Sequence, residues 1–89
     1  MNTVTIYTKP TCPYCMAAKV LLNDKGVKFN EISIEGDRAA ALALAERTGR
    51  RTVPQIYIGL THVGGFDDLV AAEESGRLDR LLGQLSQSV

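Results

Sequence analysis

Two cysteines separated by two residues, Cys12 and Cys15, constrain this chain more than any other feature, because it has no others. Residues 3–8 before them have the pattern of a strand, and residues 16–25 after them that of a helix. The pair therefore falls where a strand turns into a helix. A helix N-terminus carries unpaired N–H groups and a partial positive charge, which stabilise a thiolate. The sequence predicts Cys12 as the attacking sulfur and Cys15 as the resolving sulfur.

Other uses of such a cysteine pair fit this sequence less well. A structural zinc site needs four ligands, and besides the cysteines the chain has a single histidine, His62. A c-type haem site needs a histidine directly after the second cysteine, where Met16 stands. A purely structural disulfide would close a very short loop and restrain little of the unfolded chain. The pattern therefore favours redox chemistry, and no metal site is predicted.

Length and composition predict a single domain over residues 1–89. The chain is long enough for one compact core, and its 45% hydrophobic and 22% charged residues are ordinary for a soluble protein. Ten basic and ten acidic residues give a formal net charge of zero, which gives no indication of nucleic acid or membrane binding. With no apolar leader or long apolar run, and a lone working dithiol, we expect a cytoplasmic monomer.

Apolar periodicity and glycine positions divide the chain into alternating strands and helices. Strands are predicted over residues 3–8, 27–34, 54–58 and 62–64, and helices over 16–25, 37–48, 67–75 and 78–85, with a polar tail at 86–89. Gly26, Gly49 and Gly76 each follow a helix, where a C′ glycine belongs, and Asp37 is a predicted N-cap. Leucines at 78, 81, 82 and 85 have the spacing of an amphipathic helix, and Ile32 and Ile34 are predicted to share one strand face.

This order of elements predicts an α/β fold with a four-stranded mixed sheet flanked by helices, β-α-β-α-β-β-α-α. A strand–helix–strand opening implies a parallel pair with a right-handed crossover. The connection at residues 59–61 implies a hairpin, which adds antiparallel pairing.

Two further motifs allow more than one interpretation. Thr52-Val53-Pro54 opens the third strand, where a proline is tolerated by sterics alone. Gly64 to Asp68 leads into the third helix, where acidic residues suit the helix dipole. The functional alternative is that the glycines let the backbone approach a ligand while Asp67 takes a cationic amine. Asp68 is open to a capping role, and His62 is predicted to be a strand residue rather than a catalyst.

Together with the cysteine pair, these motifs resemble the thioredoxin-like superfamily and, within it, a dithiol glutaredoxin of the small bacterial kind. The resemblance covers essentially the whole chain and rests on Thr8-Lys-x-x-Cys-Pro-Tyr-Cys15, Thr52-Val-Pro54 and Gly64-Gly-x-Asp-Asp68. It implies a thioredoxin-like fold with Pro54 in a cis peptide bond facing the cysteines. It also implies a glutathione-dependent oxidoreductase that reduces protein disulfides and protein–glutathione mixed disulfides.

The same resemblance implies glutathione as the reducing co-substrate and no tightly bound cofactor. Disulfide-containing or glutathionylated proteins are the implied partners, with ribonucleotide reductase as one candidate. Cys12 corresponds to the nucleophile that takes the glutathionyl group, and Cys15 to the resolving thiol. The implied glutathione-binding residues are Lys9, Tyr14, Thr52, Val53, Pro54, Gly65, Phe66 and Asp67. Among these, the Val53 main chain would pair with the cysteinyl part of glutathione, and Asp67 would hold its γ-glutamyl end.

One position departs from the family pattern. Ala41 stands where many members carry a polar or basic residue that grips the glycyl carboxylate of glutathione. Arg38 or Arg51 could take over the role of that residue, in addition to Lys9, which lies just before the cysteine motif. The sequence leaves this choice open.

Two alternative functions compete with that of a glutathione-dependent enzyme. A redoxin served by a flavoprotein reductase is disfavoured because Lys9, the Thr52 motif and the Gly64 motif make sense as tripeptide contacts. An iron–sulfur carrier would hold a [2Fe–2S] cluster through Cys12 of two subunits and two glutathiones. Pro13 restricts the loop and disfavours this carrier.

Overall fold

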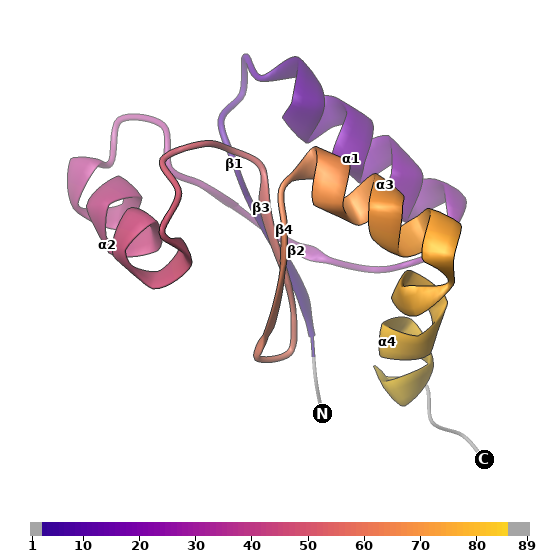
Figure 1. The fold of residues 1–89 in the computed structure, drawn as a ribbon. Helices are drawn as coiled ribbons and strands as arrows, with labels where there is room; N and C mark the ends of the chain where they lie inside the picture. Colours follow the sequence, from indigo (N-terminus) through magenta and orange to yellow (C-terminus); the bar gives the residue numbers. More distant parts are fainter. Residues whose placement is uncertain (1–2, 86–89) are drawn as a thin grey trace.

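The computed structural model describes residues 3–85 and shows a four-stranded sheet between two layers of helices (Figure 1). The strands are β1 (Val4–Thr8), β2 (Asn30–Ser33), β3 (Gln55–Ile58) and β4 (Thr61–Gly64). The helices are α1 (Pro13–Asp24), α2 (Arg38–Thr48), α3 (Phe66–Ser75) and α4 (Arg77–Leu85). Helix α2 lies on one side of the sheet, and α1 and α3 lie on the other. The predicted order of elements is confirmed, and the predicted tail at 86–89 lies outside the described residues.

The sheet is mixed, with the strand order β2-β1-β3-β4. Strand β1 pairs in parallel with β2, as in Tyr7 with Ile32, and antiparallel with β3, as in Tyr7 with Gln55. The β3–β4 hairpin is antiparallel. Because β1 and β3 run in opposite directions, the C-terminal end of β1 lies next to the start of β3, at the same end of the sheet. The cysteine motif and the Thr52-Val53-Pro54 segment are therefore brought together.

The core lies between the sheet and the layer formed by α1, α3 and α4. Its centre consists of side chains with no exposed surface: Ile6, Leu22, Ile56, Leu69 and Leu78. Partly buried Leu81 and Leu82 pack against it, as the amphipathic spacing of the last helix predicts. Whether Leu85 continues this face lies outside the side chains that the structure describes.

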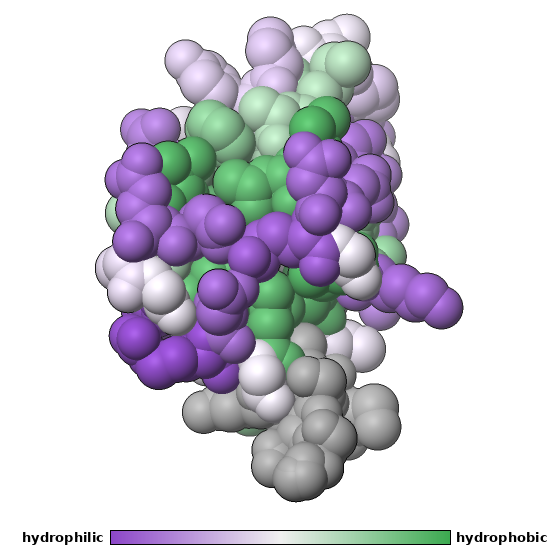
Figure 2. Space-filling view, turned by 90° about the vertical axis from the view of Figure 1, so that its right-hand side faces the viewer, coloured by the Kyte–Doolittle hydropathy of each residue, from purple (hydrophilic) through white to green (hydrophobic). Residues whose placement is uncertain are grey.

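The face of α1 that points away from the core leaves some apolar surface exposed to solvent. Figure 2 looks onto the α1 and α3 side and shows apolar side chains gathered between hydrophilic ones. Met16 and Val20 of α1 are 58% and 57% exposed, respectively. Within residues 3–85, no helix is long and apolar enough to cross a membrane.

Helix α1 begins three residues earlier than predicted, at Pro13 rather than Met16. Proline is favoured at the first helical position, where its missing N–H has no partner to lose. Cys12 consequently becomes the N-cap, and Cys15 lies in the first turn. The predicted cap of α2 is confirmed, because the Asp37 carboxylate accepts a hydrogen bond from the Ala40 N–H at 2.9 Å.

Strand β2 is shorter than predicted and lies at the edge of the sheet. The prediction of a strand over residues 27–34 is wrong because β2 pairs only with β1, over four residues from Asn30 to Ser33. The Ile34 N–H still donates to the Thr8 carbonyl at 2.9 Å, so the backbone follows β1 as far as Ile34. Ile34 is buried, whereas Ile32 on this edge strand is 42% exposed, so the two do not form one buried face.

Leu78→Ala tests how α4 is attached to the core. Leu78 is fully buried near the start of the helix, so its truncation should lower the free energy of unfolding by about 2–4 kcal/mol. Leu60→Ala is the matched control, because Leu60 is fully exposed in the β3–β4 turn. Urea unfolding followed by circular dichroism measures both variants. A loss no larger than that of the control would contradict the packing described here.

Candidate active site

Cys12 lies at the N-terminus of α1 and is partly exposed. Its sulfur accepts a hydrogen bond from the Cys15 N–H at 3.3 Å, and the thiol donates to the Val53 carbonyl at 3.5 Å. The first N–H groups of a helix and its dipole favour negative charge at such a position. The Cys12 sulfur is therefore partly exposed and lies beside a backbone N–H of the first helical turn.

Cys15 has a different environment, although it lies only one turn further along α1. Its side chain is 1% exposed, and burial raises the pKa of the thiol to about 11. A hydrogen bond from the Lys9 backbone acts in the opposite direction without cancelling this effect. Cys15 is thus a neutral thiol at neutral pH, and solvent does not reach it. The two cysteines therefore differ in exposure, because Cys12 is partly exposed and Cys15 is buried.

The segment facing Cys12 is Thr52-Val53-Pro54. The Val53–Pro54 peptide bond is cis, which confirms the sequence prediction. Pro54 is buried and precedes β3, while Thr52 is exposed and Val53 is half-buried.

A cavity of about 310 Å³ opens beside this segment. It is bounded by the start of α1, the residues before β3 and the start of α3. Its lining residues are Tyr14, Arg50, Thr52, Val53, Pro54, Gly65, Phe66, Asp67 and Asp68. We call it the thiol cavity, because the Val53 carbonyl in its wall contacts Cys12. All the binding residues that the sequence predicted line this cavity, except Lys9.

Lys9 lines a neighbouring cavity of about 260 Å³, which we call the basic cavity. Arg38, Ala41 and Arg51 line it as well, with an apolar part from α2, and it shares Arg50 and Thr52 with the thiol cavity. Arg38 and Arg51, which could replace the missing polar residue at position 41, therefore both line this cavity. The structure places positive charge at this end of the site.

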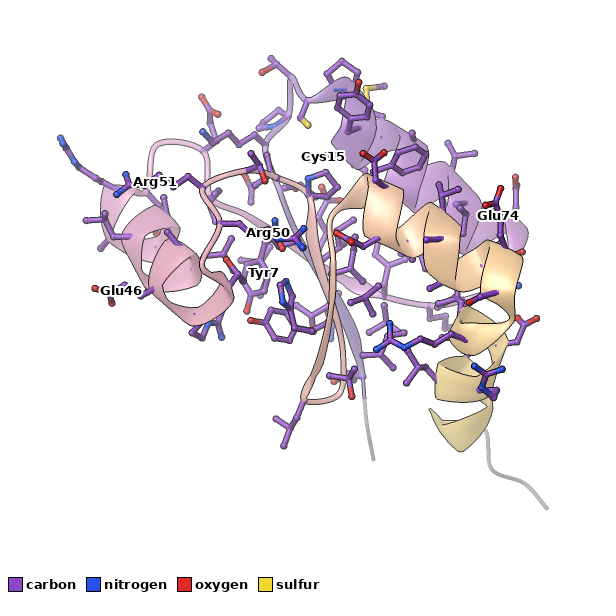
Figure 3. All side chains as sticks on the ribbon, viewed as in Figure 1. Tyr7, Cys15, Glu46, Arg50, Arg51 and Glu74 are labelled. Carbon is purple, nitrogen blue, oxygen red and sulfur yellow. The ribbon has the colours of Figure 1, made fainter. Side chains whose placement is uncertain are left out.

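Arg50 is the residue that the sequence reasoning missed. Its Nη1 atom lies 2.6 Å from Oδ2 of Asp68, and this same oxygen accepts a hydrogen bond from the Gly65 N–H at 2.9 Å. Figure 3 shows Arg50 and Arg51 turned to opposite sides, with Arg51 toward α2 and Arg50 toward the sheet. In the sequence the two adjacent arginines look equivalent. The acidic pair at the start of α3 is the sequence signal for a partner to one of them.

Asp68 has the capping role that the sequence left open, because its carboxylate accepts from the N–H of Gly65, the N-cap residue of α3. The Arg50 guanidinium, and then the Gly65 N–H, lower the pKa of the Asp68 carboxyl. Gly64 has φ +122°, and a Cβ there would collide with the Asp68 side chain. The glycine is thus required for the close approach that closes the end of the thiol cavity.

This thioredoxin-like arrangement has clear counterparts among known proteins. The family model described as Glutaredoxin matches residues 4–63. Glutaredoxin 3 of Escherichia coli (strain K12) is 54% identical over 82 residues, which cover 92% of this chain and 99% of that protein. The solution structure of a glutaredoxin from Brucella melitensis is also 54% identical, with a TM-score of 0.83, and the match covers 92% of this chain and 89% of that one.

A more distant structure was solved with a ligand. The crystal structure of a buckwheat glutaredoxin–glutathione complex is 31% identical, with a TM-score of 0.88 over 93% of this chain and 78% of that one. By fold and site the protein is a thioredoxin-like thiol–disulfide oxidoreductase. The chain belongs to the glutaredoxin family and is a glutathione-dependent enzyme. The family assignment favours this function over a redoxin served by a flavoprotein reductase.

Asp68→Asn tests the contact between Arg50 and the start of α3. Because the folded-state pKa of Asp68 is lowered, its contribution is present above the unfolded-state pKa of about 3.9 and is lost as pH falls through the folded-state value. The carboxylate is 39% exposed, so we expect a screened loss of about 0.5–1 kcal/mol at pH 7. Urea unfolding from pH 7 to pH 3 should show this difference shrinking. Glu35→Gln, an exposed loop carboxylate, is the control, and a difference independent of pH would contradict the assignment.

Proposed function

We propose that this glutaredoxin uses Cys12 and Cys15 to reduce both protein–glutathione mixed disulfides and protein disulfides. The observation that supports this most directly is the contrast between the cysteines. One sulfur is accessible at a helix N-terminus beside a cavity, and the other is a buried neutral thiol one turn away. The accessible sulfur can attack a substrate, and the buried sulfur can act only on what is bound to the first.

The monothiol route needs Cys12 alone. Its thiolate attacks the glutathionyl sulfur of a mixed disulfide, a Cys12–glutathione disulfide forms, and the protein thiolate leaves and takes up a proton. The thiolate of a free glutathione then attacks the bound glutathionyl sulfur. Glutathione disulfide leaves, and the Cys12 thiolate is restored. Glutathione is oxidised, and the protein cysteine is reduced.

The dithiol route adds Cys15. Cys12 attacks a protein disulfide and forms a mixed disulfide with one substrate cysteine. Cys15 then loses its proton and attacks the Cys12 sulfur, which expels the substrate as a thiol and leaves a Cys12–Cys15 disulfide. Two glutathione molecules reduce that disulfide and become glutathione disulfide. The raised pKa of Cys15 keeps it a neutral thiol when no mixed disulfide is present at Cys12, which limits attack by Cys15 on other disulfides.

Charge and shape support one orientation of glutathione across the two cavities. The N–H and C=O groups of Val53 would pair with its cysteinyl part beside Cys12, with Tyr14 and Phe66 as apolar walls. The tilted rings of Tyr14 and Phe66 lie 6.0 Å apart. The γ-glutamyl end would lie at Asp67, at the exposed start of α3. The glycyl carboxylate would point into the basic cavity toward Lys9 and Arg51 or Arg38.

We further propose that the enzyme acts as a monomer in the cytoplasm, where glutathione keeps both cysteines reduced. The exposed Met16 and Val20 on α1 offer apolar contact to a protein substrate, next to the cysteine motif. Ribonucleotide reductase stays a candidate substrate on family resemblance alone. Reduction of a glutathionylated peptide, coupled through glutathione reductase to NADPH consumption, tests the function as a whole, and no activity would contradict it.

Single-cysteine variants separate the two routes. Cys15→Ser should keep most activity toward a glutathionylated peptide and lose the dithiol route to a protein disulfide. Cys12→Ser should lose both, because the remaining thiol is buried and protonated. The coupled assay measures the first activity, and single-turnover reduction of a protein disulfide without glutathione measures the second. Activity that survives in Cys12→Ser and disappears in Cys15→Ser would reverse the roles.

Asp67→Asn tests the proposed γ-glutamyl contact. Asp67 is exposed, so loss of its charge should raise the KM for a glutathionylated peptide by about three- to tenfold and leave kcat nearly unchanged. Steady-state kinetics of the coupled assay give both constants. Asp24→Asn, at the far end of α1, is the matched control. An unchanged KM would mean that the Asp67 carboxylate serves only the helix dipole.

A further inference from the structure

His62 and Gln55 form a hydrogen-bonded pair behind the thiol cavity that no step above uses. His62 Nε2 lies 2.7 Å from Gln55 Oε1. The Gln55 amide nitrogen donates to the Thr52 carbonyl at 3.0 Å and lies 3.4 Å from the Thr52 hydroxyl. Gln55 is completely buried, and His62 is half-buried on β4. A buried amide with a partner at each end has little freedom to reorient.

The chemistry of the three groups fixes the direction of these hydrogen bonds. The Thr52 carbonyl can only accept, so the NH₂ group of Gln55 must face it. The Gln55 carbonyl oxygen then faces His62 and can also only accept. His62 must therefore carry a hydrogen on Nε2. The hydrogen bonds therefore all run in one direction, from the imidazole through the amide to the Thr52 carbonyl.

The surroundings of His62 favour a neutral ring at pH 7. Burial lowers the pKa of His62, the Arg50 and Arg47 guanidinium groups lower it further, and Asp68 acts in the opposite direction. The Tyr57 ring packs against the imidazole with centroids 5.0 Å apart. The Nε2–H tautomer satisfies Gln55 without placing another positive charge beside Arg50.

This series of hydrogen bonds ends at the backbone segment that faces the reactive sulfur. Thr52 lies between α2 and β3, outside the helix and the sheet ladder. The next residue is Val53, whose carbonyl accepts from the Cys12 thiol at 3.5 Å. Any rotation of the Thr52–Val53 peptide plane would move both the Thr52 carbonyl and the Val53 N–H. Gln55 holds the first of these groups and thereby orients the second.

We propose that His62 and Gln55 are positioning residues that orient the Val53 N–H toward the glutathionyl group and so set the preference for glutathione-containing disulfides. This rests on the proposed glutathione orientation, in which the Val53 backbone pairs with the cysteinyl part. The pair does not contact the reacting sulfur. Its loss should weaken recognition of glutathione and leave the general reactivity of Cys12 unchanged.

The test compares two substrates that share one peptide. The peptide cysteine carries either glutathione or 2-mercaptoethanol, and single-turnover reduction by the full-length enzyme gives a rate ratio. His62→Leu removes the donor to Gln55 and should lower this ratio about fivefold, the factor that corresponds to one neutral hydrogen bond. His62→Gln supplies an amide donor and should restore most of it. Thr61→Val, the neighbouring β4 residue, should leave the ratio unchanged.

The outcomes separate this inference from the proposed function. A wild-type enzyme that reduces neither peptide would overturn the proposed function. A wild-type enzyme with no preference for the glutathionylated peptide would overturn the proposed glutathione orientation and the positioning role with it. A wild-type preference that His62→Leu retains, or an equal loss of rate on both substrates, would overturn the positioning role alone. Nitrogen NMR of the wild-type ring at pH 7 provides a measurement that needs no variant. The neutral Nε2–H tautomer is expected, and the Nδ1–H tautomer would overturn the proposal.

Discussion

The antiparallel pairing of β1 with β3 is the constraint on which the rest of the site depends. It places the end of one strand against the start of another, so that the cysteine motif following β1 faces the Val53–Pro54 segment preceding β3. The parallel pairing of β1 with β2 requires a crossover, and α1 supplies it. The N-terminus of that helix is therefore fixed at the same end of the sheet. A reactive sulfur and the backbone that faces it are both held by strand register, and neither relies on a long loop.

The difference between the cysteines follows from the geometry of one helix start. An N-cap residue lies outside the first turn, so its side chain can accept an N–H bond while it stays partly exposed. A residue three positions later points back over the sheet, and Cys15 is consequently buried. No acidic or basic side chain is needed to distinguish them. Pro13 contributes because it favours a helix that starts at that residue rather than further along the chain.

Much of this organisation could be predicted from local sequence signals. The order of elements follows from apolar periodicity and glycine positions, and the Asp37 cap follows from the residue type before a helix. The cavity residues around Thr52-Val53-Pro54 were implied by the family resemblance. The exposure of Ile32 could not be predicted, because it depends on β2 being an edge strand that pairs only with β1. The Arg50–Asp68 contact joins residues eighteen positions apart, and only the fold shows which of two neighbouring arginines reaches the carboxylate. The His62–Gln55 pair likewise depends on the β3–β4 register.

Local charge gives this electrically neutral chain a polarised site. Arg50 is paired with Asp68, so the basic cavity owes its positive charge mainly to Lys9, Arg38 and Arg51. Asp67 carries negative charge at the far side of the thiol cavity. A small peptide with a carboxylate at one end and an ammonium at the other matches this separation, whereas a uniformly charged ligand does not. Net charge therefore says little about what this site selects.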